Sequence, residues 1–425
     1  MARLQHQGVR PEALLKIALL VDVYIPVAQA AAVMMHDLAK EIQSRGHDVT
    51  VITPTASISS PWTAENIEGI KVVRVKTPDF KNIKRSSSNP VARKLANIKR
   101  GFIEGRLSSF MWQNAEDYFK DNQSDLIVYY APTIFFGELV QKLKSLWRAP
   151  SYMIIRDIFP QWLVDAGEIS PLHPGLWYMR RKEKINYKAA DTIGIQSPAN
   201  KDYFIENGYD HGKTFDVIFN WTDSDRFTPA TGKWREEFGF KETDVIFFFG
   251  GAFTEAQDMP NLLRLAKNLS DTPNAKFLFV GKGAKYNEVE TIINTQKLTN
   301  VTLRPAVDHK TFLEIMADID VGLITLRQNL GTHNVPGKLL DYIVFGKPVL
   351  ASLNTGNDLS GILNDSGAGF AFENSEDSAL ADAARKLTTD QNLRHKAGQK
   401  GLELQKKQFS VSRAADQILK HIDKA

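Results

Sequence analysis

Residues 16–52, KIALLVDVYIPVAQAAAVMMHDLAKEIQSRGHDVTVI, contain the pattern that decides the fold. The short apolar run at 16–21 predicts a buried strand, and the apolar residues between 31 and 42 then recur at helical spacing. Gly46 is placed to end that helix, and a second apolar run follows at 49–52. A strand, a helix and a strand in this order form a βαβ unit, whose two strands are parallel.

The same alternation continues along the chain. It predicts further strands at 70–75, 126–130, 152–155 and 192–196, and it restarts after 229 with strands at 244–249, 276–280, 301–303, 321–325 and 348–351. We therefore predict an α/β protein with two Rossmann-like, doubly wound parallel sheets that face a cleft. The predicted domains are 14–215 and 216–409, with a last helix at 410–425 that packs back on the first domain. Ligands of such sheets bind at the carboxyl ends of the strands.

Composition excludes several classes of protein. The 425 residues are 43% hydrophobic and 24% charged, which is ordinary for a globular protein, and no apolar run approaches the ~20 residues that span a bilayer. The chain has no cysteine, which excludes disulfides, thiolate metal sites and a cysteine nucleophile and favours the cytosol. The histidines show no zinc-type spacing, so we expect no metal. A net charge of +4 is too small to indicate nucleic-acid binding.

Residues 334–342, NVPGKLLDY, predict the start of a helix that binds an anion. Pro336 suits the first helical position, and the free N–H groups of a first turn attract an anion together with the helix dipole. Lys338 adds a positive charge, and Asp341 lies on the same helix face. A cation for phosphate and a carboxylate for ribose hydroxyls suit a nucleotide. The alternative is an ordinary capped helix with a surface lysine and aspartate.

Residues 79–112 form a basic segment with interleaved large apolar residues. It contains eight lysines and arginines against two acidic residues. This combination favours contact with an anionic membrane surface, and the alternative is a solvated loop that leads into an amphipathic helix packed on the core. The residues predicted for the membrane surface are Lys81, Lys84, Arg85, Arg93, Lys94, Lys99, Arg100, Arg106, Phe110 and Trp112.

Four segments, in order, resemble a known family. They are GHDVTVITP at 46–54, VIFNWTD at 217–223, FLFVGKG at 277–283 and GKPV at 346–349. Together they resemble the retaining nucleotide-sugar glycosyltransferases of the GT-B fold, family four, over nearly the whole chain from Leu15. More narrowly, RDIFPQW at 156–162, residues 250–257 and Pro336-Gly337-Lys338 resemble the amino-sugar transferases, of the L-fucosamine type, that assemble bacterial O-antigen and capsule.

The chain departs from that family at several positions. Most members have two glutamates separated by seven residues; Asp341 occupies the second position and His333 the first. The family's arginine and lysine after the first strand of the second domain correspond to Gly251 or Ala252 and to Gln257, so that Lys338 is a candidate for the missing cation. Its cleft histidine aligns best with Arg156.

The resemblance nevertheless implies a site. Tyr24 and Pro26 stand where the family has a Gly-Gly pair and are assigned to the acceptor side. The residues expected to be catalytic are Arg156, Asp157 and His333, and those expected to bind the donor are Gly250, Gly251, Gln257, Pro336, Gly337, Lys338 and Asp341. Structural alternatives remain for these residues: an ion pair at 156–157, a surface histidine at 333, a helix cap at 257–258 and a simple turn at 250–251.

The resemblance also implies an activity. The chain is expected to be a retaining transferase without metal or cofactor, which moves an N-acetyl amino sugar, N-acetyl-L-fucosamine, from a UDP-sugar to a polyprenyl-diphosphate-linked saccharide. It would work in O-antigen, capsule or lipopolysaccharide biosynthesis as a cytoplasmic protein, peripherally associated with the inner face of the cell membrane and with no nucleic-acid partner. For enzymes of this type the departing diphosphate can act as the base. Two rivals stay open: a sugar-nucleotide epimerase of similar architecture, and a non-catalytic sugar-nucleotide-binding protein.

Overall fold

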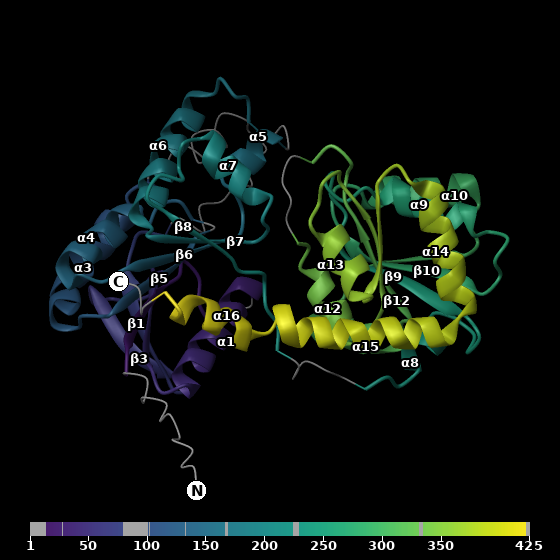
Figure 1. The fold of residues 1–425 in the computed structure, drawn as a ribbon, viewed down its shortest axis with the longest axis horizontal. Helices are drawn as coiled ribbons and strands as arrows, with labels where there is room; N and C mark the ends of the chain where they lie inside the picture. The colour runs from purple at the N-terminus through teal and green to yellow at the C-terminus, as the bar shows by residue number, and fades with distance from the viewer. Residues whose placement is uncertain are drawn as a thin grey trace, which may run out of the picture. The chain divides into compact units, whose positions relative to one another are not determined.

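The computed structural model describes residues 14–27, 29–79, 101, 103–131, 133–165, 169–223, 229–330 and 335–421. Two separate sheets with helices on their faces make up the fold (Figure 1), which confirms the predicted class of two Rossmann-like α/β halves. By its contacts the chain divides into two compact units, 1–153 with 185–191 and 422–425, and 154–184 with 192–421. The predicted domain limits, 14–215 and 216–409, stay a prediction.

The first sheet has eight strands in the order β3-β4-β2-β1-β5-β6-β7-β8. The predicted βαβ unit lies at its centre, where β1 pairs in parallel with both β2 and β5. The strands are β1 Lys16–Leu20, β2 Asp48–Thr55, β3 Trp62–Ile67, β4 Ile70–Lys76, β5 Leu126–Ala131, β6 Ser151–Ile155, β7 Thr192–Ile195 and β8 Thr214–Val217.

Strand β3 is antiparallel to β4, which makes the first sheet mixed rather than purely parallel as predicted. Glu68 and Gly69 join the two strands and both have a positive φ, of 49° and 92°, which is typical of a tight hairpin turn. The strand was not predicted because none of its residues is fully buried and its alternation of apolar and polar side chains is short, ending at Asn66.

Helices cover the first sheet. The apolar residues predicted at helical spacing lie on α1, where Met35, Leu38 and Ile42 are buried. The helices are α1 Ala30–Ser44, α3 Leu107–Asp121, α4 Gly137–Trp147, α5 Gln161–Asp165, α6 Pro174–Ala189 and α7 Asn200–Glu206.

The second sheet has six strands in the order β11-β10-β9-β12-β13-β14, and every described pair is parallel. Its strands are β9 Val245–Ala252, β10 Ala275–Lys282, β11 Val301–Pro305, β12 Val321–Thr325, β13 Val349–Leu353 and β14 Gly369–Glu373. Strand β14 extends the sheet beyond the last predicted strand. The helices are α8 Lys233–Glu237, α9 Met259–Asn268, α10 Tyr286–Gln296, α11 His309–Asp318, α12 Lys338–Val344, α13 Leu359–Ser366, α14 Asp377–Thr389, α15 Gln391–Gln408 and α16 Val411–Leu419.

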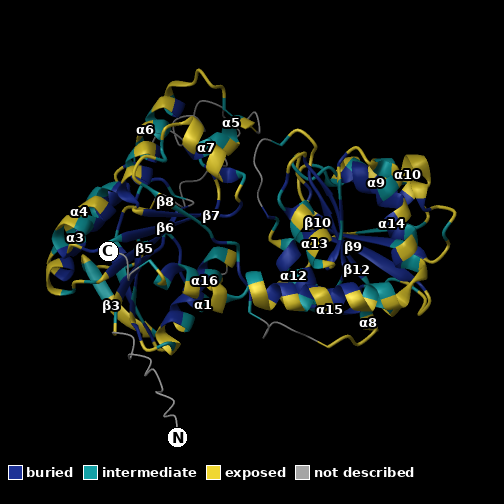
Figure 2. Cartoon of the chain, viewed as in Figure 1, coloured by how far each residue is buried: buried dark blue, intermediate teal, exposed yellow. Residues whose placement is uncertain are grey.

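The second sheet is buried on both faces, as Figure 2 shows for its strands. One face carries the apolar cluster that includes Phe248, Met316, Tyr342 and Phe345, and the other carries a cluster around Phe247 and Phe277. A strand that is buried on both faces has a continuous run of apolar residues. This explains why the run VIFFF at 245–249 was predicted to be a strand.

The last helices return the chain to strand β8. Gln405 on α15 donates to the carbonyl of Thr222 at 2.8 Å. Beyond α16, Lys420 forms an ion pair with Asp216 on β8 at 2.9 Å, and the His421 ring lies 3.2 Å from the other oxygen of that carboxylate. Strand β8 is an edge strand of the first sheet.

Candidate functional site

The carboxyl end of β9, an inner strand of the second sheet, exposes backbone on the side of the sheet where its strands end. The strand ends in Gly250-Gly251-Ala252, and the last two of these residues are exposed. A side chain at Gly250 would place its Cβ 2.5 Å from the Phe312 ring, and a Cβ at Gly281 on the neighbouring β10 would lie 2.0 Å from the carbonyl oxygen of Gly251. Gly251 has a φ of +134°, which side chains rarely adopt. Because these residues are glycines, no side chain of theirs covers the backbone at the ends of β9 and β10, and a ligand can approach the main chain there.

Lys338 reaches this end of β9 from α12. Its Nζ donates to Gln257 Oε1 at 2.6 Å and lies 4.3 Å from the centre of the Phe249 ring. Its Cε would be 3.8 Å from a Cβ at Gly251. Three of the predicted donor-binding residues, Gly251, Gln257 and Lys338, are therefore neighbours, although they come from three separate segments.

The environment of Lys338 alters its proton affinity. The side chain retains some contact with solvent, but the surrounding protein desolvates the ammonium and lowers its pKa to about 8. The carboxylate of Asp341, one turn along the helix, opposes that shift. Lys338 is therefore mostly charged at neutral pH, and its ammonium is poorly solvated, which favours contact with an anion.

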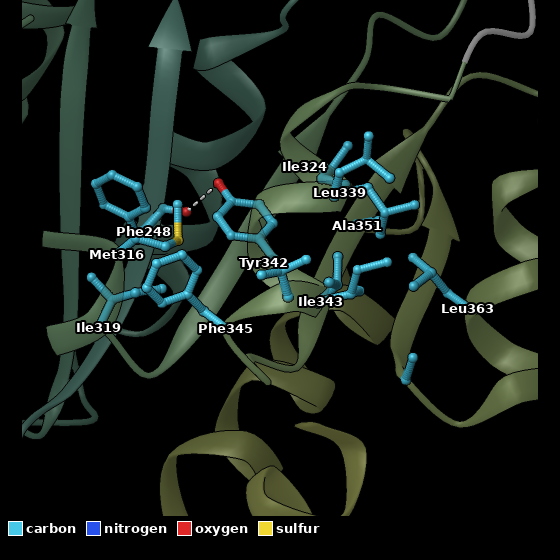
Figure 3. Packing of buried hydrophobic residues seen from close by; sticks show 14 of the residues in the cluster. Phe248, Met316, Ile319, Ile324, Leu339, Tyr342, Ile343, Phe345, Ala351 and Leu363 are labelled. Atoms are coloured by element: carbon cyan, nitrogen blue, oxygen red, sulfur yellow. Dashed lines mark hydrogen bonds between the residues drawn. The ribbon is translucent and has the colours of Figure 1, made fainter. Parts of the chain in front are cut away.

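Helix α12 holds Lys338 against β9. The Tyr342 hydroxyl lies within hydrogen-bond distance of the carbonyls of Phe248, at 3.0 Å, and Leu323, at 3.1 Å. Figure 3 shows the first of these contacts at the centre of the apolar cluster. Gly322 makes room for the ring, because a Cβ there would come within 2.2 Å of it. The packing of Tyr342 thus fixes the helix from which Lys338 extends.

The start of α12 differs from the prediction. The helix begins at Lys338, so Pro336 lies two residues before its first residue. Pro336 has no N–H, and the N–H groups of Leu339 and Leu340 already donate to the carbonyls of Pro336 and Gly337. The helix is also only seven residues long. The ammonium of Lys338, rather than a helix dipole, is therefore the main positive charge at this point.

A buried amide cluster fixes the loop that carries Gln257. Asp258 caps α9 by accepting from the N–H of Asn261, and its other oxygen accepts from Asn374 at 3.0 Å. Asn374 also donates to the carbonyl of Leu326 at 2.7 Å. Asp258 is thus a structural cap, one of the alternatives for the 257–258 pair, whereas the Gln257 side chain bonds to Lys338.

A hollow of about 210 Å³ lies beside this loop and contains charged residues that the sequence analysis missed. Glu255 forms ion pairs with Lys285 at 2.8 Å and with Arg327 at 3.1 Å. The Lys285 partner lowers the pKa of Glu255, and the same contact raises that of Lys285. Arg327 follows β12 and Lys285 follows β10, so a search for cations just beyond the carboxyl ends of strands would have found both.

Arg156 and Asp157 directly follow β6, as predicted, but they differ in environment. Arg156 is buried, donates to the carbonyl of Ile218 at 2.7 Å and lies over the Trp221 ring at 4.9 Å. Asp157 reaches solvent, yet the surrounding protein partly desolvates it and raises its pKa, which Arg156 opposes. Arg156 thus ties β6 to the segment 218–221.

On the acceptor side, Tyr24 is buried and Pro26 is exposed. The Tyr24 hydroxyl lies 2.7 Å from Nδ1 of His36, whose Nε2 lies 3.2 Å from a Glu68 oxygen. Burial raises the pKa of Tyr24 well above its usual value. Tyr24 is therefore part of a structural hydrogen-bond chain that runs through His36 to Glu68.

Other predicted residues lie outside the described part of the chain. These are His333 and, in the basic segment, Lys81, Lys84, Arg85, Arg93, Lys94, Lys99 and Arg100. Arg106 lies over the Phe110 ring at 5.2 Å, and Lys142 over the Trp112 ring at 4.7 Å. Where the structure describes the chain, none of the helices combines the length and apolar character needed to cross a bilayer.

Comparison with known proteins assigns both halves of the chain. Residues 30–219 match the family described as glycosyl transferase 4-like domain, and residues 231–404 match the glycosyl transferases group 1. A probable glycosyltransferase, WbjE of Pseudomonas aeruginosa, is 25% identical over 239 residues, which are 54% of this chain and 57% of that protein.

Solved structures of similar fold include three transferases or synthases. Sucrose-phosphate synthase of Thermosynechococcus elongatus has a TM-score of 0.67 at 15% identity, covering 96% of this chain and 98% of its own. WaaG, a glycosyltransferase involved in lipopolysaccharide biosynthesis, has a TM-score of 0.59 at 15% identity, covering 96% and 99%. Anabaena HepE in complex with UDP-glucose has a TM-score of 0.62 at 18% identity, covering 97% and 100%. With both halves matched and this fold shared, the chain belongs to the group 1 glycosyltransferases of the GT-B fold.

Proposed function

We propose that this glycosyltransferase moves an N-acetyl amino sugar, N-acetyl-L-fucosamine, from UDP to a polyprenyl-diphosphate-linked saccharide during assembly of a surface polysaccharide. Membership of the family and the likeness to WbjE support sugar transfer, and the fold shared with WaaG, which is involved in lipopolysaccharide biosynthesis, supports a surface polysaccharide as the product. The observation that carries the proposal is the placement of Lys338 beside the bare backbone of Gly251.

Lys338 binds the donor diphosphate in this proposal. Its ammonium donates to the neutral amide of Gln257, whereas the nearby Lys285 and Arg327 are already paired with Glu255. The charge of Lys338 is therefore the one least compensated by a direct carboxylate contact. A diphosphate over Gly251 would meet that charge and an exposed main chain, and Asp341, three residues after Lys338, would hold the ribose hydroxyls.

The reaction exchanges one bond at the anomeric carbon. The bond from that carbon to the UDP oxygen breaks, and a bond to the acceptor hydroxyl oxygen forms with retention of configuration. The hydroxyl proton passes to the departing diphosphate, so that no separate protein base is required. Lys338 assists because negative charge grows on the diphosphate as it leaves, and a fixed cation lowers the energy of that state.

A lipid-linked acceptor also requires the enzyme to reach a membrane. The basic segment 79–112 suits an anionic surface. In its described part Arg106 lies over the Phe110 ring, and Lys142 of α4 lies over the Trp112 ring. Leu107 and Met111 of the same helix are buried, so only part of its apolar surface is available to lipid. We propose that the enzyme acts as a peripheral protein on the inner face of the membrane.

Incubation of the purified chain with UDP-sugars, with and without a polyprenyl-diphosphate-linked saccharide, tests this function. We expect UDP release that depends on the acceptor and that is fastest with UDP-N-acetyl-L-fucosamine. Mass spectrometry of the lipid product should show the addition of one N-acetyl-fucosamine residue.

Other outcomes of that assay identify the rivals. Interconversion of the UDP-sugars without acceptor would indicate an epimerase. Calorimetric binding of UDP-sugar without any turnover would indicate a non-catalytic binding protein. Acceptor-dependent turnover with a different UDP-sugar would support the transferase activity but would rule out UDP-N-acetyl-L-fucosamine as the donor.

A further inference from the structure

The tip formed by helices α5 and α6 exposes large apolar side chains to solvent. Leu172 is 92% exposed, Trp177 is 68% exposed and Trp162 is 41% exposed. The loop before α6 and much of the outer side of this helix are exposed in Figure 2. A tryptophan and a leucine so fully in water are unfavourable unless something covers them.

Two cations lie on the same face of α6 as Trp177. Trp177, Arg181 and Lys184 are spaced by four and three residues, so they form one stripe along α6, and all three are exposed. Within the described residues neither Arg181 nor Lys184 forms an ion pair. The stripe therefore combines an aromatic end with two cations that have no carboxylate partner in the part of the chain that the structure describes.

The fold does not depend on this stripe, because the opposite side of α6 holds the helix in place. Glu183 is fully buried, accepts from Arg180 at 3.0 Å and accepts from the Tyr203 hydroxyl at 2.7 Å. Arg180 also donates to Gln161, which places α5 and its Trp162 next to α6. The contacts of Glu183 and Arg180 thus hold in place the helix that carries the exposed side chains.

The chemistry of the surface indicates what covers it. Helix α6 carries Arg180, Arg181, Lys182, Lys184 and Lys188, and its one acidic residue, Glu183, faces inward. An apolar and aromatic tip next to the exposed cations Arg181 and Lys184 matches the layers of an anionic bilayer, in which tryptophan enters the interface and lysine or arginine meets the headgroups.

We propose that the α5–α6 tip, defined by Leu172, Trp177, Arg181 and Lys184, docks on an anionic lipid bilayer. This docking surface is separate from the basic segment 79–112. The inference deepens the proposed function, on which it rests for its purpose, since a lipid-linked acceptor can be reached only at a membrane. The partner is the bilayer itself, recognised through headgroup charge and interfacial apolar contact.

Vesicle flotation of the full chain, without donor or acceptor, tests this surface. The vesicles are phosphatidylcholine alone or phosphatidylcholine with about one quarter phosphatidylglycerol. We expect the wild type to float with the anionic vesicles and the double variant Leu172→Ser, Trp177→Ser to lose about tenfold or more of its partition coefficient. The double variant Arg181→Ala, Lys184→Ala should lose about fivefold per removed charge on anionic vesicles alone.

Matched controls come from exposed residues elsewhere. Val307→Ser removes a side chain that is 37% exposed, and Lys396→Ala with Lys406→Ala removes two exposed lysines of α15. Both should leave the partition unchanged. Fluorescence quenching by brominated lipid gives a second measurement, because quenching should fall in Trp177→Phe, a variant that keeps an aromatic ring and the fold.

Several results would overturn the proposal. These are a wild type that does not float, unchanged flotation of both α6 variants, or unchanged lipid quenching in Trp177→Phe. If the only effect of Leu172→Ser, Trp177→Ser were to convert a dimer to a monomer, the tip would bind a second copy of the chain instead of lipid. If a lipid-free saccharide quenched the fluorescence of Trp177, the tip would bind sugar instead. Because the assay contains no sugar nucleotide, its failure is distinct from a failure of glycosyl transfer.

Discussion

The ammonium of Lys338 lies 2.6 Å from Oε1 of Gln257, a residue 81 positions earlier in the chain. The two belong to different βα connections of the second sheet, and each is fixed by its own buried anchor, Tyr342 for one and the Asp258–Asn374 pair for the other. A cation held by a neutral amide keeps its full charge. The pair is therefore a suitable place for a diphosphate, beside the exposed backbone of Gly251.

Replacing Lys338 with alanine should weaken binding of UDP. The loss should be about 1.5–3 kcal/mol, the range for a hydrogen bond to a charged group. Isothermal titration calorimetry measures it, with Lys267→Ala, an exposed lysine of α9, as the matched control. An unchanged affinity in Lys338→Ala would remove Lys338 from the donor site.

UDP binding should also weaken as the pH rises through about 8, the pKa to which burial lowers Lys338. The anion prefers the protonated lysine and raises its pKa when bound, so binding takes up protons above this pH and is strongest below it. Affinity should fall about tenfold between pH 8 and pH 9.5. Calorimetry in buffers of different ionisation enthalpy measures the proton uptake. Lys338→Arg should lose this pH dependence, and a wild type with constant affinity over the range would contradict the assignment.

The sequence predicted what depends on local pattern. The alternation of apolar runs and helical spacing identified eleven of the strands, and the spacing of Lys338 and Asp341 put both on α12. Strands β3 and β8 were missed because none of their residues is buried, and β14 was missed because it follows the last expected strand. Gly250–Gly251 and Arg156 lie at the carboxyl ends of β9 and β6, and the role of these ends as the place where the ligand binds stays a prediction.

Contacts between distant segments could not be predicted. Nothing local to Arg156 shows that its guanidinium bonds to a carbonyl 62 residues away. The same holds for Glu255, which contacts Arg327, and for Lys338, whose proximity to Gln257 depends on how two connections meet at the edge of the sheet. Such pairs are set by the packing of the sheet rather than by any pattern in a short stretch of sequence.

Two glycines at the candidate site should respond differently to alanine. Gly251→Ala should destabilise the fold by about 1–3 kcal/mol because a φ of +134° is strained for any side chain, although the space around it is open. Gly337 has a φ of −57° and no atom within 4 Å of a Cβ, so Gly337→Ala should be neutral or stabilising by up to about 1 kcal/mol.

Denaturant unfolding measures both glycine effects, and UDP titration of the folded variants reports on the site. If the diphosphate lies against this backbone, the methyl group of Gly337→Ala should weaken UDP binding while the fold stays intact. Equal UDP affinity in wild type and Gly337→Ala would place the phosphates away from residue 337.

Neutralising Lys81, Lys84 and Arg85 together to alanine should reduce sedimentation with anionic vesicles. Each charge near such a surface contributes about 1 kcal/mol, and the effect should shrink as salt screens it. Lys267, Lys396 and Lys406, changed together to alanine, provide a control of equal charge loss. Identical sedimentation of the 81–85 variant and this control would count against the basic segment as a membrane contact.

Arg156→Ala should mainly destabilise the fold. The variant leaves the carbonyl of Ile218 without the donor seen at 2.7 Å and removes the cation over Trp221, so the free energy of unfolding should fall by about 2–4 kcal/mol. Arg413→Ala, at an exposed arginine, is the control and should change it little. Thermal and denaturant unfolding measure the loss, and transfer assayed below the melting temperature measures any chemical role. A variant with normal stability but greatly reduced transfer would restore Arg156 to the catalytic residues, because only contact with reacting groups would then explain the loss.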